Sequence, residues 1–335
     1  MKKHLWLKIL AGILGSIAAF MLVINILPPE KNPESNPFLV EKGGLPMIAA
    51  HRGGGAVNPE NTLLAFREAV YTYGVDILES DLYMTRDGHL VFSHNSYVDL
   101  TCDANGDMSL ADVKKRCQVS SYRHYIASMT LEELQQYNFG YYFQNAHGER
   151  PYREVEDPAA MGLQIATLEQ VLGEFSETHP DLLFIVEIKD KGNRGMQVCK
   201  ALYEVLQKYP QYLNRVVVGT YHDEVEEELR THYPELLRGA STGPAAKFVV
   251  TQYLGVNLFD TGDFACLQIP VDYDVGFELN LATRSLIRRA HRRNVAVQYW
   301  TVNDPDQMRM LIELGCDAIM TDDPALLRQI LEEYR

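Results

Sequence analysis

Side chains that can carry out chemistry stand at the ends of four short apolar runs in this sequence. They are His51 with Arg52, Glu79 with Asp81, His94, and Glu187 with Lys189. Two histidines titrate near neutral pH, so a pair can act as general base and general acid. An arginine is planar and always charged, which matches a phosphate group. These residue types point to phosphoryl transfer to an oxygen rather than to acyl transfer.

The spacing of the acidic residues predicts a metal site. Residues two apart on a strand point to the same face, so Glu79 and Asp81 project together, as do Glu187 and Lys189. Carboxylates on a buried face are costly unless a cation lies among them. Three of them form an all-oxygen set, which suits Mg²⁺ or Ca²⁺ better than zinc. A structural ion-pair network with Arg52 and Lys189 is the alternative, and a single histidine is often a structural residue.

The elements that must position these residues follow from the pattern after Met47. Short apolar runs typical of buried parallel strands alternate with segments of helical spacing, which predicts an α/β fold. The strand candidates are MIAAH, VDILESDLYM, HLVFSH, DLLFIVEIKD, NRVVVGTY, LLRGAST, ACLQIP, VAVQYW and DAIMT. We expect a (β/α)8 TIM barrel, whose active site lies at the carboxyl ends of its strands.

Two points of this fold stay open in the sequence. Nine strand candidates are present for the eight strands of a barrel, so either LLRGAST or ACLQIP is expected to be an extra or irregular strand. An open doubly wound sheet is the structural alternative, but the run Gly53-Gly54-Gly55 does not open the phosphate-binding fingerprint of that fold.

Residues 95–166 are predicted to form an insertion over the barrel mouth, because connections in such folds usually take about 2–6 residues. The insertion carries a group of aromatic residues, namely Tyr137, Phe139, Tyr141, Tyr142 and Phe143. They form a small local core, a wall of the substrate pocket, or both. Cys102 and Cys117 bracket a polar stretch and can form a disulfide if the body faces an oxidising compartment.

The first 27 residues predict attachment to a membrane. Lys8 is the one charge within Leu5–Leu27, and this apolar stretch is long enough to cross a bilayer core. A cleaved signal peptide is the alternative, although its apolar part is usually shorter and precedes an Ala-x-Ala-like site. We expect residues 1–27 to be a single-pass anchor. Its N-terminal lysines favour a body outside the cytoplasm, periplasmic or extracellular.

Residues 28–46 hold five of the fifteen prolines and no apolar period, which is typical of a tether to a body of residues 47–335. After residue 27 the chain has 28 basic and 45 acidic residues. A body this acidic should repel polyanions, which excludes nucleic acid as an expected partner. The same charge argues against adhesion to anionic lipid, so membrane contact is expected to depend on the hydrophobic segment.

The order of the motifs resembles the glycerophosphodiester phosphodiesterase family. HRGGGAVNPENTLLAFREAV, LESDLYMTRDGHLVFSH, IATLEQVL, FIVEIKD, YWTVND and AIMTDDP follow one another between about Met47 and Ala325. The resemblance implies a (β/α)8 barrel with a small insertion after the third strand. It implies that His51 and His94 are the acid and base, in an unassigned order, and that Glu79, Asp81 and Glu187 bind one divalent cation. It also implies that Arg52 and Lys189 hold the substrate phosphate or the metal ligands, and that Trp300 lines the glycerol pocket.

One departure from the family is visible. The family usually has His-Asp where this chain has His94-Asn95. The histidine is kept, so the chemistry should survive, while the group that orients it differs. The other histidines, His222 and His291 among them, have no motif context.

The expected function is metal-dependent hydrolysis of a small phosphodiester substrate, a glycerophosphodiester, to sn-glycerol 3-phosphate and an alcohol. By resemblance, a neighbouring hydroxyl of the substrate attacks phosphorus first. One alternative is a lysophospholipid- or phosphoinositide-directed phosphodiesterase on the same barrel. A glycoside hydrolase would use two carboxylates about 5–9 Å apart, which leaves Arg52 and both histidines unexplained. A non-catalytic membrane-tethered binding protein is the remaining alternative, and the complete set of polar residues argues against it.

Overall fold

The computed structural model describes residues 2–27, 29–31, 35–98, 124–256, 258, 260, 262–274 and 276–335. Cys102 and Cys117 lie outside these residues, and so does their predicted disulfide. Cys199, Cys266 and Cys316 are buried thiols.

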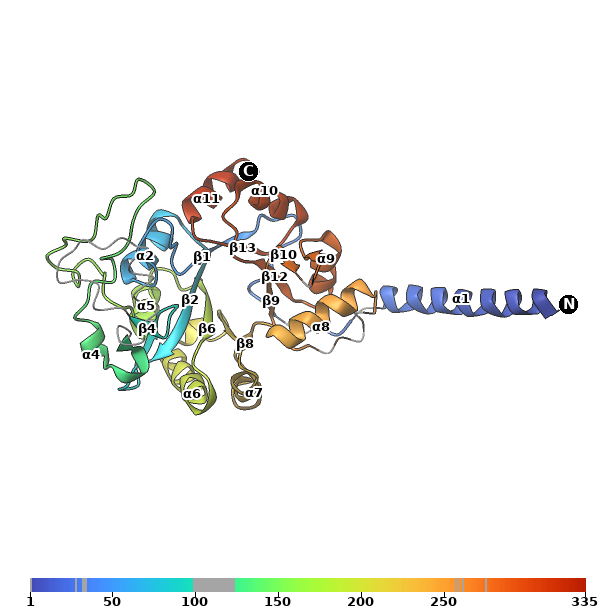
Figure 1. Cartoon of the computed structure of the whole chain (residues 1–335), viewed down its shortest axis with the longest axis horizontal. Coiled ribbons are helices and arrows are strands. Elements are labelled where there is room, and N and C mark those ends of the chain that lie inside the picture. The colour runs from blue at the N-terminus through green and yellow to red at the C-terminus, as the bar shows by residue number, and fades with distance from the viewer. Residues whose placement is uncertain are drawn as a thin grey trace.

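Eight parallel strands form a barrel with helices around it (Figure 1), in the order β8-β7-β6-β2-β1-β13-β12-β9. The strands are β1 (Met47–His51), β2 (Ile77–Met84), β6 (Leu183–Ile188), β7 (Val216–Thr220), β8 (Leu237–Arg238), β9 (Cys266–Ile269), β12 (Ala296–Tyr299) and β13 (Ala318–Thr321). Between β8 and β9, Gly239 and Cys266 form a parallel bridge, and the Ala240 N–H donates to the Cys266 carbonyl at 2.8 Å. The predicted TIM barrel is confirmed.

The ninth candidate strand is a hairpin partner outside the barrel. LLRGAST and ACLQIP contain β8 and β9, so neither is an extra strand, but β8 is irregular: it has two residues and meets β9 through the isolated Gly239–Cys266 bridge. The extra strand is β3 (Leu90–Phe92) of HLVFSH, which pairs antiparallel with β2. Only five residues connect β2 to β3, and Gly88 has φ 89° in that turn. A parallel crossover needs a dozen or more residues, so this short turn permits only an antiparallel return.

Helices cover the outside of the barrel, and capping side chains mark where several of them begin. They are α2 (Leu63–Arg67), which continues as the π-helical turn η1 (Glu68–Thr72), α5 (Leu168–Phe175), α6 (Gly192–Lys208), the 3-10 turn η4 (Pro210–Tyr212), α7 (Asp223–His232), α8 (Thr242–Tyr253), α9 (Arg284–Arg292), α10 (Pro305–Leu314) and α11 (Pro324–Glu332). Thr62 caps α2 by accepting from the Ala65 N–H at 3.2 Å. Asp304 and Asp323 cap α10 and α11, each followed by proline, which suits a first helical position.

The described part of the insertion contains short elements with a core of their own. They are β4 (Tyr97–Val98), β5 (His124–Tyr125), the 3-10 turn η3 (Ile126–Ser128) and α4 (Leu131–Leu134). Val98, Ile126, Leu134 and Ile165 form a buried cluster against which Phe139 packs. The local-core interpretation therefore holds for Phe139. A second hairpin, β10 (Asp272–Asp274) with β11 (Glu278–Asn280), follows β9.

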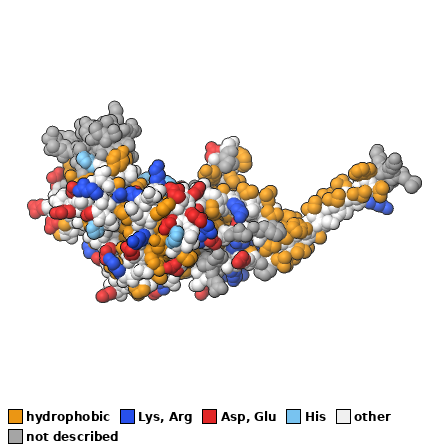
Figure 2. Space-filling model, turned by 90° about the horizontal axis from the view of Figure 1, so that it is seen from below, with side chains coloured by type: hydrophobic (Ala, Val, Ile, Leu, Met, Phe, Trp, Pro, Cys, Tyr) orange, Lys and Arg blue, Asp and Glu red, His pale blue; other side chains and the backbone are white. Residues whose placement is uncertain are grey.

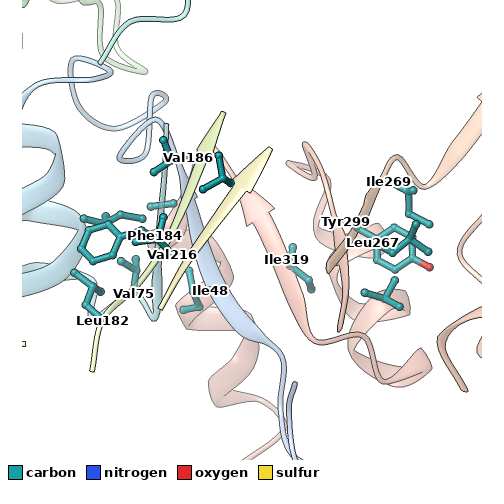
Figure 3. Close-up of a cluster of buried hydrophobic side chains, with 14 of the residues drawn as sticks. Ile48, Val75, Leu182, Phe184, Val186, Val216, Leu267, Ile269, Tyr299 and Ile319 are labelled. Atoms are coloured by element: carbon teal, nitrogen blue, oxygen red, sulfur yellow. The ribbon is translucent and has the colours of Figure 1, made fainter. Parts of the chain in front are cut away.

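Alternate residues of each strand face opposite sides of the barrel wall. Phe184 and Val186 of β6 belong to the layer between strands and helices. Figure 3 shows this layer, with Phe184 close to Val75 and Leu182. Leu183 and Ile185 belong to a separate cluster inside the barrel. The next residue of the inner series is Glu187, so the inner face changes from apolar to acidic toward the carboxyl end of the strand.

The end of the barrel where the strands begin is filled by part of the predicted tether. Phe38 is fully buried in the inner cluster. The Asn36 amide donates to the carbonyls of Ala265 and Asn294, both at 2.8 Å, and the Val40 N–H donates to Asp317. Residues 35–40 are therefore held against the barrel rather than extending freely.

Helix α1 (Lys2–Ile26) projects from the body on the side of α8 (Figure 1). Its segment Leu5–Ile26 is apolar and long enough to cross a membrane, and only 6% of its most apolar window is buried. A signal sequence has the same properties, so length and composition alone establish a candidate span.

Candidate active site

The inward-facing residues at the carboxyl ends of the strands form the candidate site. His51 ends β1, Glu79 and Asp81 lie on β2, and Glu187 lies on β6. The register places His51 beside Glu79 and Asp81 beside Glu187 on adjacent strands. Polar residues that the sequence separates by more than a hundred positions therefore meet at one end of the barrel, where such folds hold their active sites.

His51 is held by a carboxylate that the sequence interpretation did not assign to the site. Its Nδ1 lies 2.5 Å from Oδ1 of Asp322, which follows β13. The Asn303 amide donates to the other Asp322 oxygen at 2.6 Å, and the Asp322 N–H donates back to Asn303 Oδ1. Burial works to lower the pKa of His51, but the bond with Asp322 and the charge of Glu79 outweigh it, so that pKa is raised. The Nε2 of His51, 3.9 Å from Glu79, points into the site.

A tight turn after β1 aims Arg52 at the carboxylates. The Gly54 N–H donates to the His51 carbonyl at 2.8 Å, and Arg52 has φ 53°. Gly53 has φ 82°, and a side chain there would lie 3.0 Å from the Ala65 Cβ, so the turn requires glycine. The Arg52 N–H donates to Glu79, and its guanidinium lies 3.0 Å from Glu60 and 3.8 Å from Asp81.

Glu60 and its neighbours therefore do more than begin a helix. Asn61 is buried beneath the turn, accepts from the Ser80 hydroxyl and donates its N–H to the Arg52 carbonyl at 2.9 Å. Thr62 caps the start of α2. Residues 59–62 thus fix the turn that carries Arg52. Glu60 and Asp81 both lie close to the Arg52 guanidinium.

Lys189 lies between two of the predicted metal ligands. Its Nζ is 3.0 Å from Asp81 Oδ1 and 2.7 Å from Glu187 Oε1. Burial and the neighbouring charge of Asp81 raise the pKa of Glu79 to about 8. In this arrangement Lys189 supplies the positive charge that the clustered carboxylates require.

The carboxylates suit a hard cation by their chemical type. Glu79, Asp81 and Glu187 lie on adjacent strands and face the same side, and Asp81 Oδ2 is buried without a hydrogen-bond partner. Within the described ranges, no three histidine, cysteine or acidic side chains converge closely enough to hold a metal as they stand. Lys189 lies between two of the three carboxylates, Asp81 and Glu187.

His94 reaches the same end of the barrel from the β2–β3 hairpin. It is exposed, and the Ser93 N–H that precedes it donates to the Asp81 carbonyl at 2.9 Å. Partial burial and the positive charges of Arg52 and Lys189 lower the pKa of His94, while Asp81 works in the opposite direction. Among the described residues its side chain has no hydrogen-bond partner. Next to it, the Asn95 backbone carbonyl accepts from the Ser93 hydroxyl at 2.9 Å.

Two residues after β7 lie next to Lys189, and one of them, His222, has no motif context in the sequence. The Tyr221 ring centroid lies 5.6 Å from Lys189 Nζ, and His222 Nε2 lies 3.3 Å from the Lys189 carbonyl. His222 is therefore not remote from the chemistry. His291, by contrast, binds the buried Asp317 at 2.7 Å near the start of β13, at the opposite end of the barrel.

Trp300 follows β12 and is partly exposed at the carboxyl end of that strand. This is the end at which the other predicted residues meet, and a glycerol-lining role for Trp300 stays a prediction. The strand-end criterion found His51, Glu79 and Glu187. It would also have found Asp322 and Asn303, which follow β13 and β12 in the same way.

Comparison with known proteins is consistent with this geometry. The model of the glycerophosphoryl diester phosphodiesterase family matches residues 51–326. A glycerophosphodiester phosphodiesterase of Bacillus subtilis is 25% identical over 95% of this chain and 98% of its own length, and one of Caldanaerobacter subterraneus is 24% identical over 86% and 98%. A lysophospholipase D of Mus musculus is 24% identical over 85% of this chain and 82% of its own length.

Solved structures share the fold. A phosphodiesterase of Oleispira antarctica, in complex with sn-glycerol-3-phosphate, superposes with a TM-score of 0.60 at 21% identity, covering 86% of this chain and 97% of that one. A glycerophosphoryl diester phosphodiesterase domain from Mycobacterium tuberculosis gives a TM-score of 0.65 at 20% identity, covering 85% and 99%. With its barrel, its strand-end site and a family match over most of its length, this chain belongs to the glycerophosphoryl diester phosphodiesterase family.

Proposed function

We propose that the chain hydrolyses glycerophosphodiesters to sn-glycerol 3-phosphate and an alcohol, with a divalent cation, Mg²⁺ or Ca²⁺, and two-histidine acid/base catalysis. The observation that carries the proposal is the meeting of His51, Arg52 and three carboxylates at the carboxyl ends of β1, β2 and β6. Relatives named as glycerophosphodiester phosphodiesterases support the substrate class.

Glu79, Asp81 and Glu187 are the residues that would hold the cation. All three donate only oxygen, which suits a hard divalent ion, and the unpartnered Asp81 Oδ2 is available as a ligand. The cation would supply Lewis-acid stabilisation of the charge on the phosphate. Arg52 would bind phosphate oxygens bidentately, and Lys189 would add a second positive charge.

His51 and His94 are proposed as the proton-transfer pair. Asp322 binds Nδ1 of His51 and so leaves Nε2 to meet the substrate. His94 approaches from the hairpin after β3, away from β1. Two groups on different elements suit in-line displacement, in which the attacking and leaving oxygens lie on opposite sides of phosphorus.

A lysophospholipid is the second candidate substrate. It is favoured by one relative, the lysophospholipase D of Mus musculus, and by the apolar helix α1. We propose that α1 is an uncleaved anchor with its lysine-bearing end in the cytoplasm and the barrel outside. Hydrogen bonds from α9 to residues 25 and 27, close to where a cut would fall, support retention of the helix.

The deciding experiment is a substrate panel assayed with the full chain. We expect release of sn-glycerol 3-phosphate from glycerophosphocholine and glycerophosphoethanolamine, its loss with chelator, and its return with Mg²⁺ or Ca²⁺. A faster reaction with lysophosphatidylcholine would favour the second candidate. Full activity after exhaustive chelation would remove the metal from the proposal.

A further inference from the structure

Helix α1 joins the body at the end of the barrel opposite to the candidate site. The Asn25 amide donates to the Gly255 carbonyl at 3.0 Å, directly after α8. Arg289 and Arg292, in the last turn of α9, donate to Asn25 at 2.8 and 2.9 Å. Helices of this fold run antiparallel to the strands, so their carboxyl ends lie where the strands begin. The site residues lie where the strands end.

The loop after α8 reaches past the end of the apolar helix. A Cβ on Gly255 would lie 3.1 Å from the terminal methyl carbon of Met21. Met21 precedes Ile26, the end of the candidate span, by five residues, which is about 7 Å along a helix. If Leu5–Ile26 lies in a bilayer, Gly255 therefore lies at the depth of the lipid headgroups or deeper in the bilayer.

Helix α8 presents apolar side chains beside this point. Val250 and Leu254 are 55% and 63% exposed, and Tyr253 is 49% exposed. Their spacing puts them on one side of α8, while Phe248 and Val249 face the barrel core. Figure 2 shows hydrophobic side chains continuing from α1 onto the adjoining part of the body.

Arginines gather on the adjacent α9. Burial and the like charges of Arg288 and Arg292 lower the pKa of Arg289. Arg288 is exposed, and none of these three arginines forms an ion pair with a carboxylate among the described residues. The body as a whole is strongly acidic, with 28 basic against 45 acidic residues after residue 27. The positive charge of this face is therefore a local exception to that acidity.

We propose that the face formed by Val250, Tyr253, Leu254, Arg288 and Arg292 lies on the surface of an anionic phospholipid bilayer. The apolar side chains of α8 enter the headgroup layer, and the arginines of α9 contact lipid phosphates. This inference rests on the proposed anchoring by α1 and adds a second contact that orients the body. It departs from the expectation that the acidic body makes no electrostatic contact with lipid.

The orientation decides which side of the barrel lies nearest to the membrane. The Tyr253 hydroxyl donates to the Asn280 carbonyl of β11, so the β10–β11 hairpin lies beside the proposed face. Met161, which is 40% exposed, lies on the other side of the barrel, next to the start of α2, where the Gly162 carbonyl accepts from the Leu64 N–H. With the α8–α9 face on the bilayer, Met161 therefore lies away from the membrane.

The test compares two exposed apolar positions on opposite sides of the barrel. Leu254→Cys and Met161→Cys are each labelled with an environment-sensitive fluorophore in the full chain and reconstituted into phosphatidylcholine–phosphatidylglycerol vesicles. Signal from the chain without an added cysteine is subtracted. Lipids that carry a nitroxide near the headgroup should quench the probe at 254 at least about twofold and leave the probe at 161 unquenched. Flotation of the vesicles reports anchoring separately.

Charge variants test the arginines. Arg288→Glu should reduce quenching at 254 in anionic vesicles, whereas Lys200→Glu, on exposed α6, makes the same charge change elsewhere and should not. A chain that floats with an unquenched probe at 254, or with quenching at 161 instead, overturns this inference and leaves the anchor intact. Equal quenching in both charge variants overturns the role of the arginines. A chain that does not float overturns the anchor and this inference together.

Discussion

The contact between His51 and Asp322 leads to a prediction for Asp322→Asn. The change keeps the shape of the side chain and removes the negative charge 2.5 Å from His51 Nδ1. A hydrogen bond to a charged group contributes about 1.5–3 kcal/mol, or about 10- to 150-fold in rate. An Asn amide that donates to Nδ1 also favours the wrong tautomer, which raises the expected loss of kcat to about 10²–10⁴-fold.

The pH profile gives a second readout of the same substitution. Asp322 is the main group that raises the pKa of His51, so its removal lowers that pKa. If His51 donates a proton, activity is lost as pH rises through its pKa, and this limb should move to lower pH in Asp322→Asn. The assay couples release of sn-glycerol 3-phosphate to glycerol-phosphate dehydrogenase between pH 5 and 9.

The adjacent acid supplies the matched control. Asp323 caps α11 by accepting from the Leu326 N–H at 2.9 Å and does not contact His51. Asn is also a good capping residue, so Asp323→Asn should keep both fold and turnover. If Asp322→Asn folds normally and retains more than half of wild-type kcat with an unmoved pH limb, the orienting role of Asp322 is wrong.

Three further predictions concern the histidines, the metal and the barrel floor. His51→Ala and His94→Ala should each reduce turnover by about 10²–10⁴-fold without unfolding, and exposed His232→Ala should not; more than a tenth of normal turnover in both would contradict the mechanism. Glu79→Gln should weaken the rise in Tm that Mg²⁺ or Ca²⁺ produces in the wild-type chain, through binding to the folded state; an unchanged metal-dependent shift would exclude Glu79 as a ligand. Phe38→Ala should cost about 3–5 kcal/mol of unfolding free energy in urea titrations, because Phe38 is fully buried under the barrel, and a cost below about 1 kcal/mol would show that the floor does not depend on it.

The fold was predictable from local patterns except where two strands meet through a short turn. Apolar runs separated by helical spacing identify the barrel strands, because a buried parallel strand shows its burial in its own composition. HLVFSH has the same composition, since β3 is also buried. It pairs antiparallel with β2 because the TRDGH connection is too short for a parallel crossover. The length of that connection could have been recognised in the sequence. Phe38 was missed because one buried residue in a proline-rich stretch has no periodicity to reveal it.

The sequence by itself determined which residues could do chemistry and on which face of each strand they lie. Side chains alternate along a strand whatever its neighbours are, so Glu79 and Asp81 share a face before any tertiary contact forms. Only the tertiary structure decided which charges meet. The partner of His51 is Asp322, 271 residues further along the chain. Lys189, which follows β6, binds Asp81 on the adjacent strand β2. Such pairs depend on strand order and register, which are set by packing of the whole barrel and leave no local trace in the sequence.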